Sequence, residues 1–205
     1  MKVLIVNGSP HRDGNVSVAI AELKKVFADE GIEVENVEIG IKRVSGCLGC
    51  YTCGKLGKCV VDDIVNEAAE KFKAADGLIV ASPVYYASPN GTLISFLDRL
   101  FFSAKFDKRM KVGASVAVAR RGGCSATFDV LNKYFGICGM PVASSQYWNQ
   151  LHGAAPGEAA QDAEGLQTMR TLAKNMSFLM KAIALGKEKY GLPSVEDPIR
   201  TSFIR

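Results

Sequence analysis

The sequence lacks several features that would have fixed a class of protein at once. No apolar run approaches the roughly 18 uninterrupted residues of a membrane span. The first residues, MKVLIVNGSP, are too short and too early broken by turn residues for a signal peptide. The net charge is only +4, and no cluster of Lys and Arg is dense enough to indicate nucleic acid. We therefore expect a cytoplasmic protein with no membrane and no nucleic-acid partner.

Composition and length are those of an ordinary globular chain. Of the 205 residues, 48% are hydrophobic and 22% are charged, which is typical of soluble domains. We expect residues 1–205 to form one domain, with a cysteine-rich loop at 46–60 and an irregular tail from about residue 190. A core of this size needs no disulfides, so the six cysteines are interpreted as reduced thiols.

Short apolar runs alternate with segments of helical spacing along most of the chain. Strands are predicted at residues 2–7, 34–39, 77–82 and 112–119, with a fifth around Val142. Helices are predicted between them, one of them capped by Asp62 or Asp63, and a last long helix at 165–185. This alternation predicts an α/β fold: a flavodoxin-like, doubly wound, five-stranded parallel sheet of order 2-1-3-4-5 with helices on both faces.

The first strand leads directly into the segment GSPHRDGNVS at residues 8–17 and then into a helix. Such a turn offers free backbone N–H groups to a phosphate, and Ser9, Asn15 and Ser17 can add side-chain donors. The segment has neither the Gly-Lys-Ser/Thr ending of a nucleoside triphosphate loop nor the Gly-x-Gly-x-x-Gly dinucleotide pattern. A single terminal phosphate fits best, which indicates FMN. The alternatives are a plain turn with Asn15 or Ser17 as helix cap, and an exposed His11 with no ligand contact.

Two further loops follow predicted strands at the same edge. After the third strand, Pro83 and Val84 precede the pair Tyr85 and Tyr86, one of which can form a flat wall for an isoalloxazine ring. After the fourth strand, the segment 120–123 reads Arg-Arg-Gly-Gly. Its glycines let backbone approach a ring, and an arginine favours an anionic reduced flavin. The alternatives are an ordinary surface loop and two solvated arginines. Because all three loops follow parallel strands, they open onto one crevice.

Four cysteines lie within thirteen residues, in the pattern Cys-x2-Cys-x2-Cys-x5-Cys. Three interpretations of this loop compete: a [4Fe-4S] cluster, a zinc ion, and a loop of free or oxidised thiols. The tight spacing argues against zinc, which usually takes two separated Cys-x2-Cys pairs. Cys124 and Cys138 are interpreted as buried packing residues. The four candidate ligands are Cys47, Cys50, Cys53 and Cys59.

These segments together resemble a known family. GSPHRDGNVS, SPVYYASPNGTLISFLDR and CLGCYTCGKLGKC are similar to motifs of the NADPH-dependent FMN reductase and iron-sulfur flavoprotein group, within the flavodoxin-like superfamily. The resemblance covers the chain to about residue 150 and extends into the last helix. It implies that the first loop binds the FMN phosphate and the second the isoalloxazine ring, that the third, which varies more within the family, also contributes to the flavin site, and that the four cysteines hold a [4Fe-4S] cluster. The residues implied for FMN are Ser9, His11, Asn15, Val16, Ser17, Pro83, Val84, Tyr85, Tyr86, Arg120, Gly122 and Gly123.

The expected function is that of an FMN-dependent oxidoreductase. NADH or NADPH would supply electrons, and the acceptor would be a small molecule such as a quinone or free flavin, a protein, or the cluster. The protein positions and tunes the cofactor, so no catalytic residue is expected. A flavodoxin-type electron carrier and a metal or thiol-switch protein are the alternatives. We expect a homodimer or a tetramer of dimers, while Asp98 and Arg99 are expected to serve helix packing and an ion pair.

Overall fold

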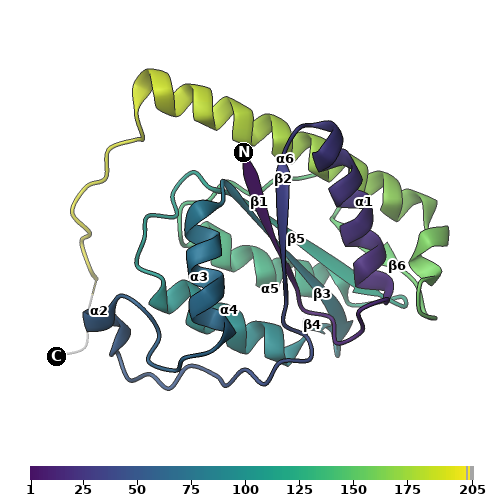
Figure 1. Cartoon of the computed structure of the whole chain (residues 1–205), viewed down its shortest axis with the longest axis horizontal. Coiled ribbons are helices and arrows are strands. Elements are labelled where there is room, and N and C mark those ends of the chain that lie inside the picture. Colours follow the sequence, from purple (N-terminus) through teal and green to yellow (C-terminus); the bar gives the residue numbers. More distant parts are fainter. Residues whose placement is uncertain (202, 204–205) are drawn as a thin grey trace.

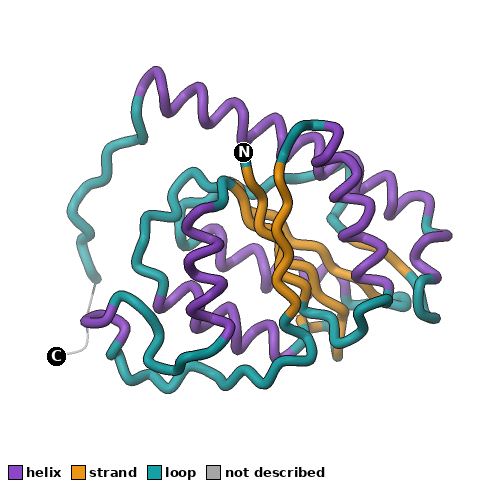
Figure 2. The backbone as a smooth tube through the Cα atoms, viewed as in Figure 1, coloured by secondary structure: helices purple, strands orange, loops and turns teal. Residues whose placement is uncertain are grey.

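A parallel sheet with helices on both faces forms the body of the protein in the computed structural model, which describes residues 1–201 and 203 (Figures 1 and 2). The strand order is β2-β1-β3-β5-β6. A two-residue strand, β4 (Ser88–Pro89), pairs antiparallel with the end of β3 outside this path. Counting the parallel strands alone, the order is 2-1-3-4-5, so the predicted flavodoxin-like topology is confirmed. The five strands are β1 (Lys2–Asn7), β2 (Glu33–Glu38), β3 (Gly77–Tyr85), β5 (Val112–Ala119) and β6 (Gln150–His152).

Successive residues of β1 point into two separate cores. Val3 and Ile5 pack with the helices on one face of the sheet, whereas Leu4 and Val6 pack on the other. All four are fully buried, as expected of a central parallel strand. The first face is covered by α1 (Asn15–Asp29) and α6 (Ala163–Tyr190). The other is covered by α3 (Ile64–Ala74), α4 (Gly91–Ser103) and α5 (Cys124–Gly136). Two short helices, α2 (Cys53–Leu56) and the 3-10 helix η1 (Glu158–Gln161), lie in connections.

Three of the described helices begin at a side-chain cap. The Asp63 carboxylate accepts the Val65 N–H at 3.1 Å and starts α3, so Asp63, and not Asp62, is the cap. Asn90 caps α4 and Asp162 caps α6 in the same way. The helix that follows the first loop is different. Among the described residues, α1 has no side-chain cap, and Gly14 precedes it.

The prediction of the fifth strand was wrong in position. Val142 forms only an isolated parallel bridge with Gly113, at the start of β5. The strand that extends the sheet is β6, whose residues pair with 117–119 at the other end of β5. The buried Asn149 accepts the Ala117 N–H through its backbone carbonyl and leads the chain into β6. The last helix is also longer than predicted and ends at Tyr190. Beyond it, the described residues form no helix or strand.

None of the described helices combines the length and the apolar character needed to cross a membrane.

Cys124 is buried as predicted, whereas Cys138 is only half-buried. The three methionines of α6 at 169, 176 and 180 all lie in the core.

Candidate flavin site

The loop after β1 is held by its own side chains. The Asn7 carboxamide oxygen accepts the Ser9 N–H at 2.9 Å, and the Ser9 hydroxyl oxygen accepts the His11 N–H at 3.1 Å. Helix α1 then begins without a side-chain cap. The N–H groups of its first residues, Asn15 and Val16, find no hydrogen-bond acceptor in the described part of the chain. An uncapped helix N-terminus of this kind favours an anion, phosphate above all.

The loop after β3 is a tight hairpin. Tyr86 and Ala87 adopt left-handed backbone conformations with φ of 51° and 56°, which turns the chain back into β4. The turn leaves the Tyr86 side chain fully exposed and Tyr85 partly exposed. Neither tyrosine is packed into the core. Tyr85 faces the cavity described below, with Pro83 and Val84 beside it.

The loop after β5 is fixed to the preceding one through a glycine. Gly123 has φ of 92°, a region that side chains rarely adopt. A Cβ at this position would lie 2.8 Å from Val84 Cγ1 and 2.9 Å from the Cα of Ala87. Gly123 therefore lets the loop after β5 approach the hairpin after β3. Gly123 shapes the site but does not line the cavity, whereas Arg120 of the same loop does line it.

A fourth segment, residues 153–156, completes the site, and no sequence signal indicated it. Gly153, Ala154 and Pro156 line the cavity. Asn15 links this segment to the first loop: its amide nitrogen donates to the Ala155 carbonyl and its oxygen accepts the Ala159 N–H, both at 3.0 Å. The expected donor to a phosphate thus serves mainly to join two loops. Correct placement of β6 would have indicated the segment, because it follows the carboxyl end of that strand.

The four segments enclose a cavity of about 410 Å³, within the usual range for small-molecule sites. Eight of the twelve residues predicted for FMN line it, whereas Ser17, Tyr86, Gly122 and Gly123 do not. Ser17 instead donates from its hydroxyl to the Arg12 carbonyl. The eight residues are Ser9, His11, Asn15, Val16, Pro83, Val84, Tyr85 and Arg120.

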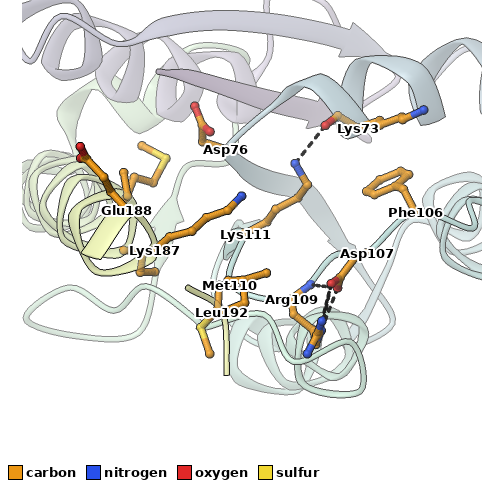
Figure 3. Close-up of a pocket in the computed structure, with 13 residues that line it drawn as sticks. Lys73, Asp76, Phe106, Asp107, Arg109, Met110, Lys111, Lys187, Glu188 and Leu192 are labelled. Carbon is orange, nitrogen blue, oxygen red and sulfur yellow. Dashed lines mark hydrogen bonds and ion pairs between the residues drawn. The ribbon is translucent and has the colours of Figure 1, made fainter. Parts of the chain in front are cut away.

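A larger cavity, of about 580 Å³, lies at the opposite end of the sheet (Figure 3). None of the predicted site residues lines it. The Lys111 ammonium donates to the carbonyls of Lys73, at 3.0 Å, and Ala75, at the end of α3, and burial lowers the pKa of Lys111. Hydrogen bonds from Arg109 hold the pKa of Asp107 at about 2. These charged groups are already engaged within the protein, Lys111 with carbonyls at the end of α3 and Arg109 with Asp107. We therefore assign the ligand site to the smaller cavity.

The cysteine segment crosses the surface beside α4. Cys47 and Cys50 are exposed, Cys59 is half-buried and Cys53 is buried; all six cysteines of the chain are free thiols. The four line one small cavity, whose wall includes Tyr51 and Phe102. Hydrogen bonds with Thr52 lower the pKa of the Cys50 thiol. Within the described residues, no three His, Cys, Asp or Glu side chains are spaced as a bound metal ion requires. Four free thiols on one largely apolar cavity are nevertheless a donor set that suits an iron-sulfur cluster.

Arg99 of α4 forms the expected ion pair. Its guanidinium binds the Asp63 carboxylate through two nitrogens, at 2.6 and 2.9 Å, and the side chain is almost completely buried. Burial lowers the pKa of Arg99, but hydrogen bonds to Asp63 and Cys59 outweigh that effect and leave the pKa raised. Arg99 is therefore a permanently charged group beneath the cysteine segment.

The strand order and the 410 Å³ cavity at the carboxyl edge of the sheet define a flavodoxin-like protein with a candidate ligand site at that edge. A model of the NADPH-dependent FMN reductase family matches residues 1–154, and the chain belongs to that family. An iron-sulfur flavoprotein of Methanocaldococcus jannaschii is 36% identical over 191 residues, covering 89% of this chain and 99% of the relative. One from Methanosarcina thermophila is 32% identical over 193 residues, 92% of this chain and 100% of the relative.

Solved structures show the same architecture. A flavodoxin from the domain Archaea superposes with a TM-score of 0.60 at 14% identity, covering 88% of this chain and 99% of the flavodoxin. At this identity the likeness concerns the fold. It agrees with the strand order and with helices on both faces of the sheet.

Proposed function

We propose that this protein is an FMN-dependent oxidoreductase. It takes electrons from NADH or NADPH and delivers them to a small acceptor or, through an iron-sulfur cluster, to a protein. The main observation behind this proposal is the 410 Å³ cavity at the strand ends. An uncapped helix N-terminus lies at one side of it and the Pro83–Tyr85 wall at another. Membership of the FMN reductase family supports the choice of cofactor and of donor. The cytoplasmic location and the single domain expected from the sequence belong to the same proposal.

The phosphate end of the site is assigned to the first loop. The N–H groups of Asn15 and Val16 point outward from the start of α1 and carry its partial positive charge. Ser9 lines the cavity beside them, with a hydroxyl that can turn toward an anion. Among the described residues, no acidic side chain lines this cavity, which favours a phosphate dianion there.

The ring end is assigned to the second and third loops. Bound FMN supplies transfer of either one or two electrons, which connects a hydride donor with one-electron carriers. Pro83, Val84 and Tyr85 offer an apolar wall for the flat ring. Arg120 brings a cation to the cavity, which favours the charge that a flavin gains on reduction. The residues bind, orient and tune the cofactor, and none is assigned a proton transfer.

The cysteine segment is proposed to hold a [4Fe-4S] cluster through Cys47, Cys50, Cys53 and Cys59. The names of the two archaeal relatives described above support this assignment, as does the cavity that all four line. With a one-electron centre in the same protein, a reduced flavin would pass its two electrons on one at a time to a protein acceptor.

Ligand binding tests the phosphate assignment directly. FMN should bind the apoprotein at least about tenfold more tightly than riboflavin, roughly 1.4 kcal/mol, as measured by quenching of flavin fluorescence. Ser17→Glu places an acid in the first turn of α1 and should weaken FMN while leaving riboflavin unchanged. Ser17→Gln, of equal size and no charge, is the matched control and should retain FMN. Equal affinities for FMN and riboflavin in the wild type would contradict the assignment.

A further inference from the structure

Arg99 is one of the largest side chains that the protein buries completely, with 2% of its surface exposed. A buried cation is costly unless charge and hydrogen bonds compensate it. One edge of the guanidinium, Nη1 and Nη2, faces the Asp63 carboxylate. The other edge, Nε and Nη2, faces the sulfur of Cys59, with both nitrogens 3.3 Å from Sγ. Arg99 therefore holds a carboxylate and a sulfur at the same time.

Cys59 is fixed by its backbone as well as by its sulfur. The Asn66 side chain accepts the Cys59 N–H at 3.0 Å and donates to the Cys59 carbonyl at 3.1 Å. Cys47 and Cys50, in contrast, have exposed side chains. Among the four cysteines, in the described part of the chain, Cys59 is thus the one whose sulfur accepts hydrogen bonds from a charged side chain.

We propose that Arg99 positions the Cys59 sulfur and raises the reduction potential of the iron-sulfur centre that this sulfur ligates. N–H groups directed at a ligating sulfur stabilise the more negative, reduced form, and so does a buried cation. Asp63 opposes that effect because its carboxylate neutralises part of the charge. Arg99 is a positioning residue, since it acts through Cys59. The inference rests on the proposed cluster.

Two variants change the potential in opposite directions. Arg99→Lys keeps the charge, but a single ammonium cannot replace both edges of the guanidinium. Asp63→Asn keeps the cap of α3, because asparagine caps as well as aspartate, and removes the opposing charge. Asn66→Ala is the matched control, because it loosens the Cys59 backbone without removing a donor to the sulfur.

The experiment is a redox titration of anaerobically reconstituted protein, followed by the visible and electron paramagnetic resonance spectra of the cluster. At fixed solution potential, Arg99→Lys should increase the ratio of oxidised to reduced cluster at least about tenfold, a shift of ~59 mV to lower potential. Asp63→Asn should shift the ratio in the opposite direction, and Asn66→Ala should leave it within about twofold of the wild type. FMN affinity, measured in the same preparations, should be unchanged throughout.

The outcomes separate the two levels of the proposal. Wild-type protein that binds FMN but contains no iron or sulfide would overturn the cluster and, with it, the role of Arg99. Wild-type protein with a cluster whose potential is the same in both variants would overturn only the role of Arg99, which would then be a packing residue. Should Arg99→Lys fail to assemble a cluster, Asp63→Asn decides: an upward shift supports the proposal and an unchanged potential overturns it.

Discussion

At the scale of single residues, the cysteines occupy two opposite environments. Cys50 is exposed, and hydrogen bonds with Thr52 lower the pKa of its thiol. Cys124 is 4% exposed and packs with Val84, Ala117 and Ala119 under the proposed ring site. Burial there raises the pKa of Cys124 to about 11. The first thiol is suited to become a ligand and the second to remain neutral.

The raised pKa of Cys124 predicts a loss of stability at alkaline pH. Between about pH 9 and 11, the unfolded chain releases the thiol proton and the folded chain keeps it. The folded state binds more protons in this window, so the free energy of unfolding falls as the pH rises. With a pKa difference of about two units, Cys124 accounts for about 2 to 3 kcal/mol of that fall.

Urea unfolding of the reduced, cluster-free apoprotein at pH 8 and pH 10.5 measures the effect. Cys124→Ala should show a smaller fall than the wild type, because the variant has no thiol to titrate. Cys47→Ala removes an exposed thiol and should keep the wild-type fall. Equal falls for Cys124→Ala and the wild type would show that Cys124 does not carry the dependence.

At the scale of elements, the first loop is pressed against the connection that leads to the cysteines. A Cβ at Gly40 would lie 1.9 Å from the Ser9 carbonyl oxygen and 2.1 Å from its carbon. These are backbone atoms, so the side chain cannot be accommodated by a change of rotamer. Gly40→Ala should displace the first loop, weaken FMN at least tenfold and destabilise the protein by about 1 to 3 kcal/mol. Calorimetric titration with FMN and thermal unfolding check both effects.

Gly46→Ala is the control for this prediction. Gly46 lies in the same connection, but no atom of the described residues stands within 4 Å of the Cβ that it would gain. It should bind FMN like the wild type. A similar loss of FMN affinity in both variants would mean that FMN binding depends on the connection as a whole and not on the contact between Gly40 and Ser9.

The cysteine segment predicts the composition of protein prepared without oxygen. Four thiolates around one cubane correspond to about four iron and four sulfide per chain. Cys53→Ala should abolish or convert the cluster, because Cys53 is the buried member of the four, while FMN stays bound in its separate cavity. Analysis of iron and sulfide, together with the flavin absorbance of the same sample, tests this prediction. Protein with FMN but neither iron nor sulfide would be a plain FMN reductase that passes hydride directly to its acceptor.

The elements also show why sequence reasoning found three of the four loops. The runs at 2–7, 77–82 and 112–119 are apolar and end in recognisable turn residues, so the loops after them could be placed. Strand β6 is three residues long and contains Gln150 and His152, too short and polar for periodicity to indicate. Its existence depends on hydrogen bonds to β5. The contacts of Asn15 with residues 155 and 159 are equally tertiary and leave no local signal.

Arg99 has one contact that the sequence predicts and one that it does not. An ion pair within a helix-packing context could be expected from the sequence, and Asp63 confirms it. The contact between the second edge of the guanidinium and the Cys59 sulfur could not be expected, because Cys59 is 40 positions away. Only the folded chain brings that sulfur beside α4.

At the scale of the whole molecule, α6 is apolar on two sides. Met169, Met176 and Met180 face the core, while Phe178 and Leu185 project outward with 71% and 67% of their surfaces exposed. Figure 1 shows the helix along one side of the molecule, extending beyond the sheet. Residues seven apart lie on one face of a helix, and large exposed apolar side chains on one face favour association. We therefore predict that two copies pair through α6 with twofold symmetry.

Sedimentation at micromolar concentration tests this pairing. The wild type should sediment as a dimer or as a tetramer built from dimers, and Phe178→Glu with Leu185→Glu should disrupt the α6 contact and reduce the mass to that of a smaller species. Both side chains are exposed in the single chain, so the double variant should keep its fold by circular dichroism. Lys133→Glu reverses an exposed charge on α5, across the sheet, and should leave the mass unchanged. A wild type that sediments as a monomer would refute the prediction. A double variant with the wild-type mass would place the interface on another element, because two buried glutamates at an apolar contact would each carry a large desolvation cost.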